Sequence, residues 1–215
     1  MRRRLIIIGT SGLSREMAMV AECVNTQSHR WELYGFVGDS LSEVGKDLGV
    51  GRILGDDDWL LSQNFEADLI IGVGYPKIRY KIIEKYLKQG NQFQYPNLIH
   101  PSATLDYRRI ELGQGNVITA GCRFTCDIEV QNFNLFNLNT TVGHDVHIGS
   151  FNVINPGVNI SGGVHIHDRV LAGTGCQILE NITIGSDAVI GAGGVVRANV
   201  LDTQTVVGVP AKPIR

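Results

Sequence analysis

The sequence has no long hydrophobic run, no excess of positive charge and no C-x-x-C cysteine pair. Its longest aliphatic run is residues 5–8, far shorter than the about 20 residues of a membrane-spanning helix. The 215 residues carry a formal net charge of −2, which argues against binding nucleic acid through its phosphates. Arginines 2–4 before this run resemble the start of a signal peptide, but Gly9 and a predicted amphipathic helix directly follow the run, and no small-residue cleavage site appears. We expect no nucleic-acid partner, no membrane span and no targeting segment.

The four cysteines form no C-x-x-C pair, which indicates the free thiols of a cytoplasmic protein. Composition changes near residue 100. Only one lysine, Lys212, lies after that point, whereas asparagine rises from four residues before it to ten after it. Pro96 and Pro101 interrupt the chain there. We therefore predict two domains, at residues 1–100 and 101–215.

The first domain alternates strand and helix signals. Short apolar runs predict strands at residues 4–8, 33–37 and 69–73. Apolar residues at helical spacing predict helices at residues 14–25, 56–62 and 77–89, the last ended by Gly90. This order predicts a small Rossmann-like parallel sheet, an α/β fold.

A strict six-residue repeat dominates the second domain. Every sixth residue from Leu112 to Val196 is apolar, at fifteen successive positions. Because about half of all positions are apolar, chance would give such a run in about one of thirty thousand trials. The residue four places later, from Asn116 to Val200, is always small, polar or β-branched. This period predicts an all-β parallel β-helix with three faces and eighteen residues per coil, without long loops.

Fifteen repeats predict five coils, stacked at about 4.8 Å into a prism roughly 20–25 Å tall. The corners between faces need tight or left-handed backbone, which favours Gly, Asn and Asp. Glycine is abundant, with 26 residues. Six glycines directly follow the repeated apolar position, and we expect them to form corners: Gly113, Gly143, Gly149, Gly173, Gly185 and Gly191.

Short motifs lie along the whole chain, at residues 9–12, 35–39, 71–74, 100–103, 143–149, 160–164, 190–193 and 207–212. Together they resemble those of the hexapeptide-repeat sugar acyltransferases, which include sialic acid O-acetyltransferases and nucleotide-aminosugar N-acetyltransferases. The resemblance implies a nucleotide-sugar-binding first domain, a left-handed β-helix that binds acetyl-CoA, and a homotrimer with active sites between subunits. It implies a cytoplasmic enzyme of polysaccharide biosynthesis that acetylates the amino group of a nucleotide-linked 4-amino-6-deoxysugar.

His144 is the candidate general base. It follows Gly143 at an expected corner, and a neutral imidazole can accept a proton near pH 7. The resemblance implies this role for His144 and an acidic partner in Asp145, which would orient the imidazole. Neighbouring residues of a strand point apart, so the corner must bend the two together. The alternative is an ordinary exposed corner histidine.

The resemblance also implies the groups that hold acetyl-CoA. Backbone N–H groups at glycine corners can bind its carbonyl and amides, and cationic side chains can meet its phosphates. The candidates are Gly162, Gly163, Gly173, Thr174, Gly191, Ala192, Arg197 and Lys212. Val153 stands where several relatives carry a second histidine, so that histidine's contacts are not transferred.

The candidate nucleotide-sugar site lies in the first domain. Residues at the start of the first helix can bind an anion, and an acidic residue after the second strand can hold a ribose or base. The candidates are Gly9, Thr10, Ser11, Gly12, Leu13, Asp39 and Gly74. Relatives often carry histidine at the position of Leu13. NAD is a less favoured ligand, because the third glycine of G-x-G-x-x-G is missing.

Three other functions stay open at this point. The acceptor could be a sugar hydroxyl, as in sialic acid O-acetylation. Glu129, His147 and His165 are eighteen residues apart, so they form an outward column that could hold a metal in a carbonic-anhydrase-like hydratase. No metal is expected, because stacked histidines are more often plain surface residues. A non-catalytic binding trimer is the third alternative.

Overall fold

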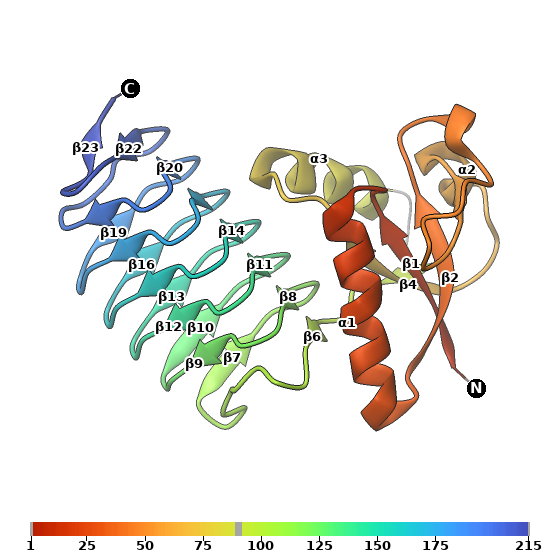
Figure 1. Ribbon diagram of the computed structural model, residues 1–215, viewed down its shortest axis with the longest axis horizontal. Helices are drawn as coiled ribbons and strands as arrows, with labels where there is room; N and C mark the ends of the chain where they lie inside the picture. Colours follow the sequence, from red (N-terminus) through yellow and green to blue (C-terminus); the bar gives the residue numbers. More distant parts are fainter. Residues whose placement is uncertain (1, 89–91, 215) are drawn as a thin grey trace.

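The computed structural model describes residues 2–88 and 92–214, which form an α/β domain beside a parallel β-helix (Figure 1). The α/β domain contains β1 (Arg3–Ile8), α1 (Gly12–Ser28), β2 (Trp31–Val37), the 3₁₀ helix η1 (Leu41–Glu43), β3 (Ile53–Gly55), α2 (Asp57–Leu61), β4 (Ala67–Ile71), α3 (Pro76–Leu87) and β5 (Phe93–Gln94). Its five strands are parallel, in the order β3-β2-β1-β4-β5.

The predicted strands and helices of this domain are confirmed, with two additions. β3 and β5 were not predicted, because runs of three and two residues carry no clear alternation. β4 lies two residues earlier than expected, since Ala67 and Asp68 pair with β5. The predicted helix stop at Gly90 lies outside the described residues. Within residues 2–88 and 92–214, no helix combines the length and apolar character that crossing a bilayer requires.

The β-helix has three faces, which we name A, B and C in chain order. Face A contains β6 (Leu98–Ile99), β8 (Val117–Ile118), β11 (Leu135–Phe136), β14 (Val153–Ile154), β17 (Leu171–Ala172), β20 (Val189–Ile190), β22 (Thr205–Val207) and β23 (Lys212–Pro213). Face B contains β9 (Arg123–Phe124), β12 (Thr141–Val142), β15 (Asn159–Ile160), β18 (Gln177–Ile178) and β21 (Val195–Val196). Face C contains β7 (Ile110–Leu112), β10 (Ile128–Val130), β13 (His147–Ile148), β16 (His165–Ile166) and β19 (Thr183–Ile184).

The predicted coil length is confirmed. Paired strands of neighbouring coils are eighteen residues apart, as in His147 against His165. The exceptions are at the two ends, where Leu98 pairs with Val117 after nineteen residues and Val189 pairs with Thr205 after sixteen. Both repeated positions point inward: the apolar series forms the core, and the second series from Asn116 to Val200 is buried throughout. β-Branched side chains suit this narrow interior because they pack well on short pleated strands.

The corners turn through left-handed backbone. Every sixth residue from Gly115 to Gly193 has a positive φ, at fourteen successive corners. The six glycines that were expected at the turns are not among them. They sit two residues earlier, where the next coil comes too close for a side chain: a Cβ on Gly143 would lie 2.7 Å from the Gly162 nitrogen, and one on Gly173 would lie 2.5 Å from the Ala192 nitrogen.

The α/β domain sits on face A and on the corner between faces C and A. Met17, Ala18 and Ala21 of α1 share a core cluster with Val117 and Leu135 of face A. α3 lies over the neighbouring corner, as Figure 1 shows. The corner between faces B and C therefore lies away from this contact.

Candidate active site

His144 and Asp145 meet at the corner between faces B and C. His144 Nδ1 lies 2.7 Å from Asp145 Oδ2. The left-handed backbone of Asp145, with φ 57°, bends the two side chains together, although neighbours on a strand would point apart. Both are about two-thirds exposed, at 65% and 66%. With Nδ1–H donating to the carboxylate, Nε2 is the nitrogen that can accept a proton.

The imidazole lies over the next coil at Gly162. A Cβ on Gly162 would lie 2.6 Å from His144 Cε1 and 2.7 Å from Nε2. Gly163 N–H donates to the His144 carbonyl at 2.9 Å. Glycine at position 162 therefore leaves room for the ring, and the backbone of the next coil fixes the residue that carries it.

A second carboxylate stands one coil before Asp145. Asp127, also left-handed with φ 55°, accepts a hydrogen bond from Arg109 Nε at 3.0 Å. This bond is the main cause of the lowered pKa of Asp127, to which the charge of His144 also contributes. Sequence reasoning missed Asp127; the signal was its spacing of eighteen residues from Asp145.

The candidate acetyl-CoA residues lie on two corners. Gly162, Gly163 and Arg197 share the corner of His144, after strands of face B. Gly173, Thr174, Gly191 and Ala192 follow strands of face A, at the corner between faces A and B, and Lys212 lies in β23. A single chain therefore brings His144 together with Gly162 and Gly163, but not with the four residues of the other corner.

Several expected amide donors are already used inside the chain. The N–H groups of Gly163, Gly173 and Gly191 donate to His144, Ile190 and Val206 carbonyls at 2.8–2.9 Å. Across the described part of the chain, we find no intrachain acceptor for the N–H groups of Gly162, Thr174 or Ala192. Each of these residues stands at the second position after a strand of the β-helix. They are the donors that remain available.

A pocket of about 430 Å³ lies at the carboxyl ends of β1, β2 and β4. This is where ligands bind in open parallel sheets. Of the predicted substrate residues, it is lined by Gly9, Thr10, Ser11, Asp39 and Gly74. Gly12 and Leu13 are not part of the lining. Leu13 packs beneath it, close to Gly74.

Sequence reasoning missed the other wall of this pocket. Asp57, Tyr75, Ile78 and Ile82 line it from α2 and α3. Tyr75 is 64% exposed and stands at the start of α3. The helical spacing of α3 places Ile78 and Ile82 on one face of the helix. Whether that face lines the pocket depends on how the helix packs on the sheet, which the spacing does not show.

The predicted histidine column on face C is confirmed. The rings of His147 and His165 stack with centroids 4.6 Å apart and planes at 10°, and Glu129 Oε2 lies 3.1 Å from His147 Nδ1. Among residues 2–88 and 92–214, no three His, Cys, Asp or Glu side chains are placed to hold a metal ion. Parallel rings direct their nitrogen lone pairs side by side rather than toward one point.

The chain is similar to known proteins in both sequence and fold. Residues 4–86 match the family model of the PglD N-terminal domain. The acetyltransferase domain of PglB from Neisseria gonorrhoeae, in complex with acetyl coenzyme A, is 30% identical over 100% of both chains, with a TM-score of 0.87. A search of curated proteins gave no match.

Two further solved structures extend the likeness. PerB from Caulobacter crescentus, in complex with CoA and GDP-perosamine, is 28% identical over 98% of this chain and 97% of that chain, with a TM-score of 0.87. WeeI from Acinetobacter baumannii is 25% identical over 98% and 99%, with a TM-score of 0.84. The left-handed β-helix and the α/β domain are thus shared over the full length. The chain belongs to the hexapeptide-repeat sugar acetyltransferases with a PglD-type N-terminal domain.

Proposed function

We propose that this protein transfers the acetyl group of acetyl-CoA to the amino group of a nucleotide-linked 4-amino-6-deoxysugar. The observation that carries the proposal is the His144–Asp145 pair, in a chain that matches acetyltransferases over its full length. Two other matches support the role of a histidine: they are asparagine and alanine variants, at a single histidine, of the Caulobacter enzyme, in complex with CoA and GDP-perosamine.

Each domain binds one of the two substrates. Residues 1–100 bind the nucleotide sugar in the pocket at the sheet edge, where the first turn of α1 offers N–H groups to the phosphates. Residues 101–215 bind acetyl-CoA along the β-helix, with Arg197 and Lys212 available for its phosphates. Gly162 N–H has no acceptor among residues 2–88 and 92–214 and is adjacent to the imidazole, so we assign it to the thioester oxygen.

His144 supplies the acid–base chemistry. The acceptor reacts as the neutral amine, and Nε2 takes one proton from its nitrogen as that nitrogen attacks the thioester carbon. Asp145 holds Nδ1–H and stabilises the imidazolium that forms. The tetrahedral oxyanion accepts the Gly162 N–H bond. As the C–S bond breaks, the imidazolium returns its proton to the sulfur, which leaves free CoA and an amide.

The site is complete only in an oligomer. His144 and Gly162 lie at one corner, whereas Thr174 and Ala192 lie at another. The N–H groups of Thr174 and Ala192 also lack an acceptor in the described part of the chain. A homotrimer would set the first corner of one copy against the second corner of its neighbour. The product would be an acetamido sugar nucleotide for polysaccharide biosynthesis.

Thiol release from acetyl-CoA tests the function directly. The acceptors are UDP-, dTDP- and GDP-linked 4-amino-6-deoxysugars and sialic acid. We expect turnover on one amino sugar that is lost in His144→Ala. His147→Ala is the matched control, because His147 is a partly exposed histidine that contacts Glu129 and His165 instead. Turnover on sialic acid alone would replace the proposal by O-acetylation. Turnover that survives His144→Ala would show that His144 is not the general base.

A further inference from the structure

The corner between faces C and A breaks the pattern of the other two corners. Elsewhere the left-handed positions hold only Gly, Asn or Asp: Gly121, Asn139, Gly157, Gly175 and Gly193 on one corner, and Asp127, Asp145, Gly163 and Asn181 on the other. At this corner, Phe133, Phe151 and Arg169 adopt φ values of 58°, 63° and 57°. Bulky side chains disfavour this backbone, so some other interaction must hold them there.

These side chains contact the α/β domain. The rings of Phe133 and Phe151 stack with centroids 5.3 Å apart, and Phe133 meets Tyr95 edge to face at 5.4 Å. Phe151 meets Tyr80 of α3 edge to face at 5.3 Å, and the guanidinium of Arg169 lies 5.6 Å from the same ring centre. The corner therefore carries aromatic and cationic contacts that fix α3 to the prism.

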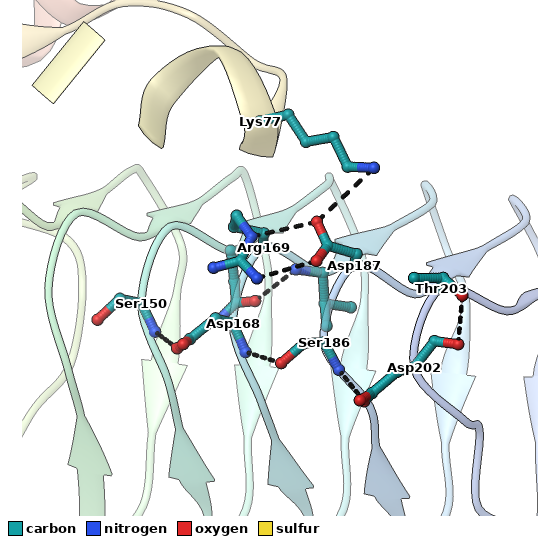
Figure 2. A network of polar contacts seen from close by, with 10 residues as sticks. Lys77, Ser150, Asp168, Arg169, Ser186, Asp187, Asp202 and Thr203 are labelled. Carbon is teal, nitrogen blue, oxygen red and sulfur yellow. Dashed lines mark hydrogen bonds and ion pairs between the residues drawn. The ribbon is translucent and has the colours of Figure 1, made fainter. Parts of the chain in front are cut away.

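An ion-pair chain continues this contact along the corner. Arg169 Nη2 donates to Asp187 Oδ2 at 2.9 Å, and Lys77 Nζ of α3 lies 3.7 Å from Asp187 Oδ1. Figure 2 shows Lys77 reaching down from α3 to this carboxylate, above the ladder of corner side chains. The interface thus spans several coils.

Arg79 lies at the centre of this interface. Its side chain is fully buried. Nε and Nη2 donate to the Phe133 carbonyl at 3.1 and 3.0 Å. Nη1 donates to the carbonyls of Ile71 and Val73, both at 2.9 Å. Burial lowers the pKa of Arg79 to about 9, which leaves it charged at neutral pH.

The carbonyls that Arg79 binds belong to two functional parts. Ile71 ends β4, and Val73 lines the sheet-edge pocket together with Gly74. Between them, the Gly72 carbonyl accepts from Ser14 Oγ of α1 at 2.9 Å. Three successive carbonyls at the end of β4 are therefore held by side chains, and Arg79 joins this loop to the prism by hydrogen bonds to both.

We propose that Arg79 is a positioning residue that fixes the pocket loop, residues 71–74, to the Phe133 corner of the prism. Through this link the bound nucleotide sugar has one orientation relative to the catalytic β-helix assembly. The planar guanidinium can donate to the Phe133 carbonyl and to the carbonyls of the pocket loop at the same time. A lysine ammonium cannot reproduce this forked arrangement of donors. The inference rests on the proposed function for its kinetic consequences, but its structural consequence can be measured without substrate.

The kinetic test compares Arg79→Lys and Phe151→Gly with Lys81→Met, a control on an exposed residue of α3. We expect Arg79→Lys to lower kcat about tenfold or more, because small displacements of reacting groups are costly. Its KM for the nucleotide sugar should rise, while the KM for acetyl-CoA stays within about twofold. Phe151→Gly removes the ring but suits φ 63°, so it should lower kcat at unchanged nucleotide-sugar KM.

Hydrogen exchange gives the substrate-free readout. Arg79→Lys should speed amide exchange at residues 71–75 and 132–135 and leave coil residues 176–190 unchanged. Uniformly faster exchange would overturn the inference, as would folded variants with wild-type kcat and KM or an equal rise in both KM values. If Arg79→Lys does not fold, Phe151→Gly decides through exchange and kcat. If the wild type acetylates no amino sugar, the proposed function fails, and the exchange pattern still decides the role of Arg79.

Discussion

Replacing Gly162 with alanine should disable His144 without unfolding the β-helix. The new Cβ would lie 2.6 Å from His144 Cε1, whereas contacting carbon atoms stand about 3.5–4.0 Å apart. Gly162 does not have a positive φ, so alanine fits the backbone itself. The exposed imidazole can move by about 1 Å. This displacement relieves the clash and changes the free energy of unfolding only slightly.

The displacement sets the size of the effect. Misplacing a catalytic group by about 1 Å reduces the rate on the order of 100-fold, which corresponds to about 2.7 kcal/mol of transition-state stabilisation. We expect that loss in kcat/KM, measured by thiol release from acetyl-CoA. The free energy of unfolding should fall by less than about 1 kcal/mol, measured by urea denaturation.

A double mutant separates this explanation from damage elsewhere. If Gly162→Ala acts by moving the imidazole, it should add no further loss in the His144→Ala background. Additive losses would refute the reasoning, because they would mean that position 162 acts independently of His144. Wild-type activity in Gly162→Ala would refute it more simply.

Three further predictions follow from the same structure. Asp145→Asn should lower kcat on the order of 100-fold with little change in the KM for acetyl-CoA, because the imidazole loses its orientation; an unchanged kcat would contradict this. Asp187→Asn should destabilise the protein by about 1–3 kcal/mol at pH 7. Because the hydrogen bond from Arg169 lowers the pKa of Asp187, this stability is present above the unfolded-state pKa of about 3.9. It is lost as pH falls from that value through the lower folded-state pKa, so the difference between the two proteins should shrink steadily as denaturation is repeated at lower pH. Ile160→Ala, in the fully packed core, should cost about 2–5 kcal/mol of unfolding free energy, and a loss below about 1 kcal/mol would mean that the core collapses around the cavity.

The architecture of the β-helix could be predicted because its signal is local and repeated. An inward residue every six positions specifies faces, coil length and core together, and each repeat supports the others. The left-handed position was harder to place. Glycine marks two different corner positions, one because the next coil comes close, as at Gly143, and one because φ is positive, as at Gly163. Composition alone does not separate these two reasons.

The site was predicted in part. His144 and Asp145 are adjacent in sequence, so only the bend between them needed the structure. The availability of an N–H group, in contrast, depends on hydrogen bonds between coils. The Gly173 N–H donates to the Ile190 carbonyl, whereas the Thr174 N–H has no acceptor among the residues that the structure describes. The amphipathic pattern of residues 77–89 does not predict that the Arg79 side chain is buried. Its burial arises from packing α3 on Phe133, 54 residues away, which no local pattern encodes.

The most direct test of the account is the identity of the bond formed in the reaction. The nucleotide-linked 4-amino-6-deoxysugar that the enzyme turns over is incubated with acetyl-CoA, and the product is analysed by mass spectrometry before and after mild base. The account predicts one added acetyl group that survives base as an amide and is absent with His144→Ala. An acetyl group removed by base would show an ester, and no added acetyl group on any amino sugar would contradict the proposed function.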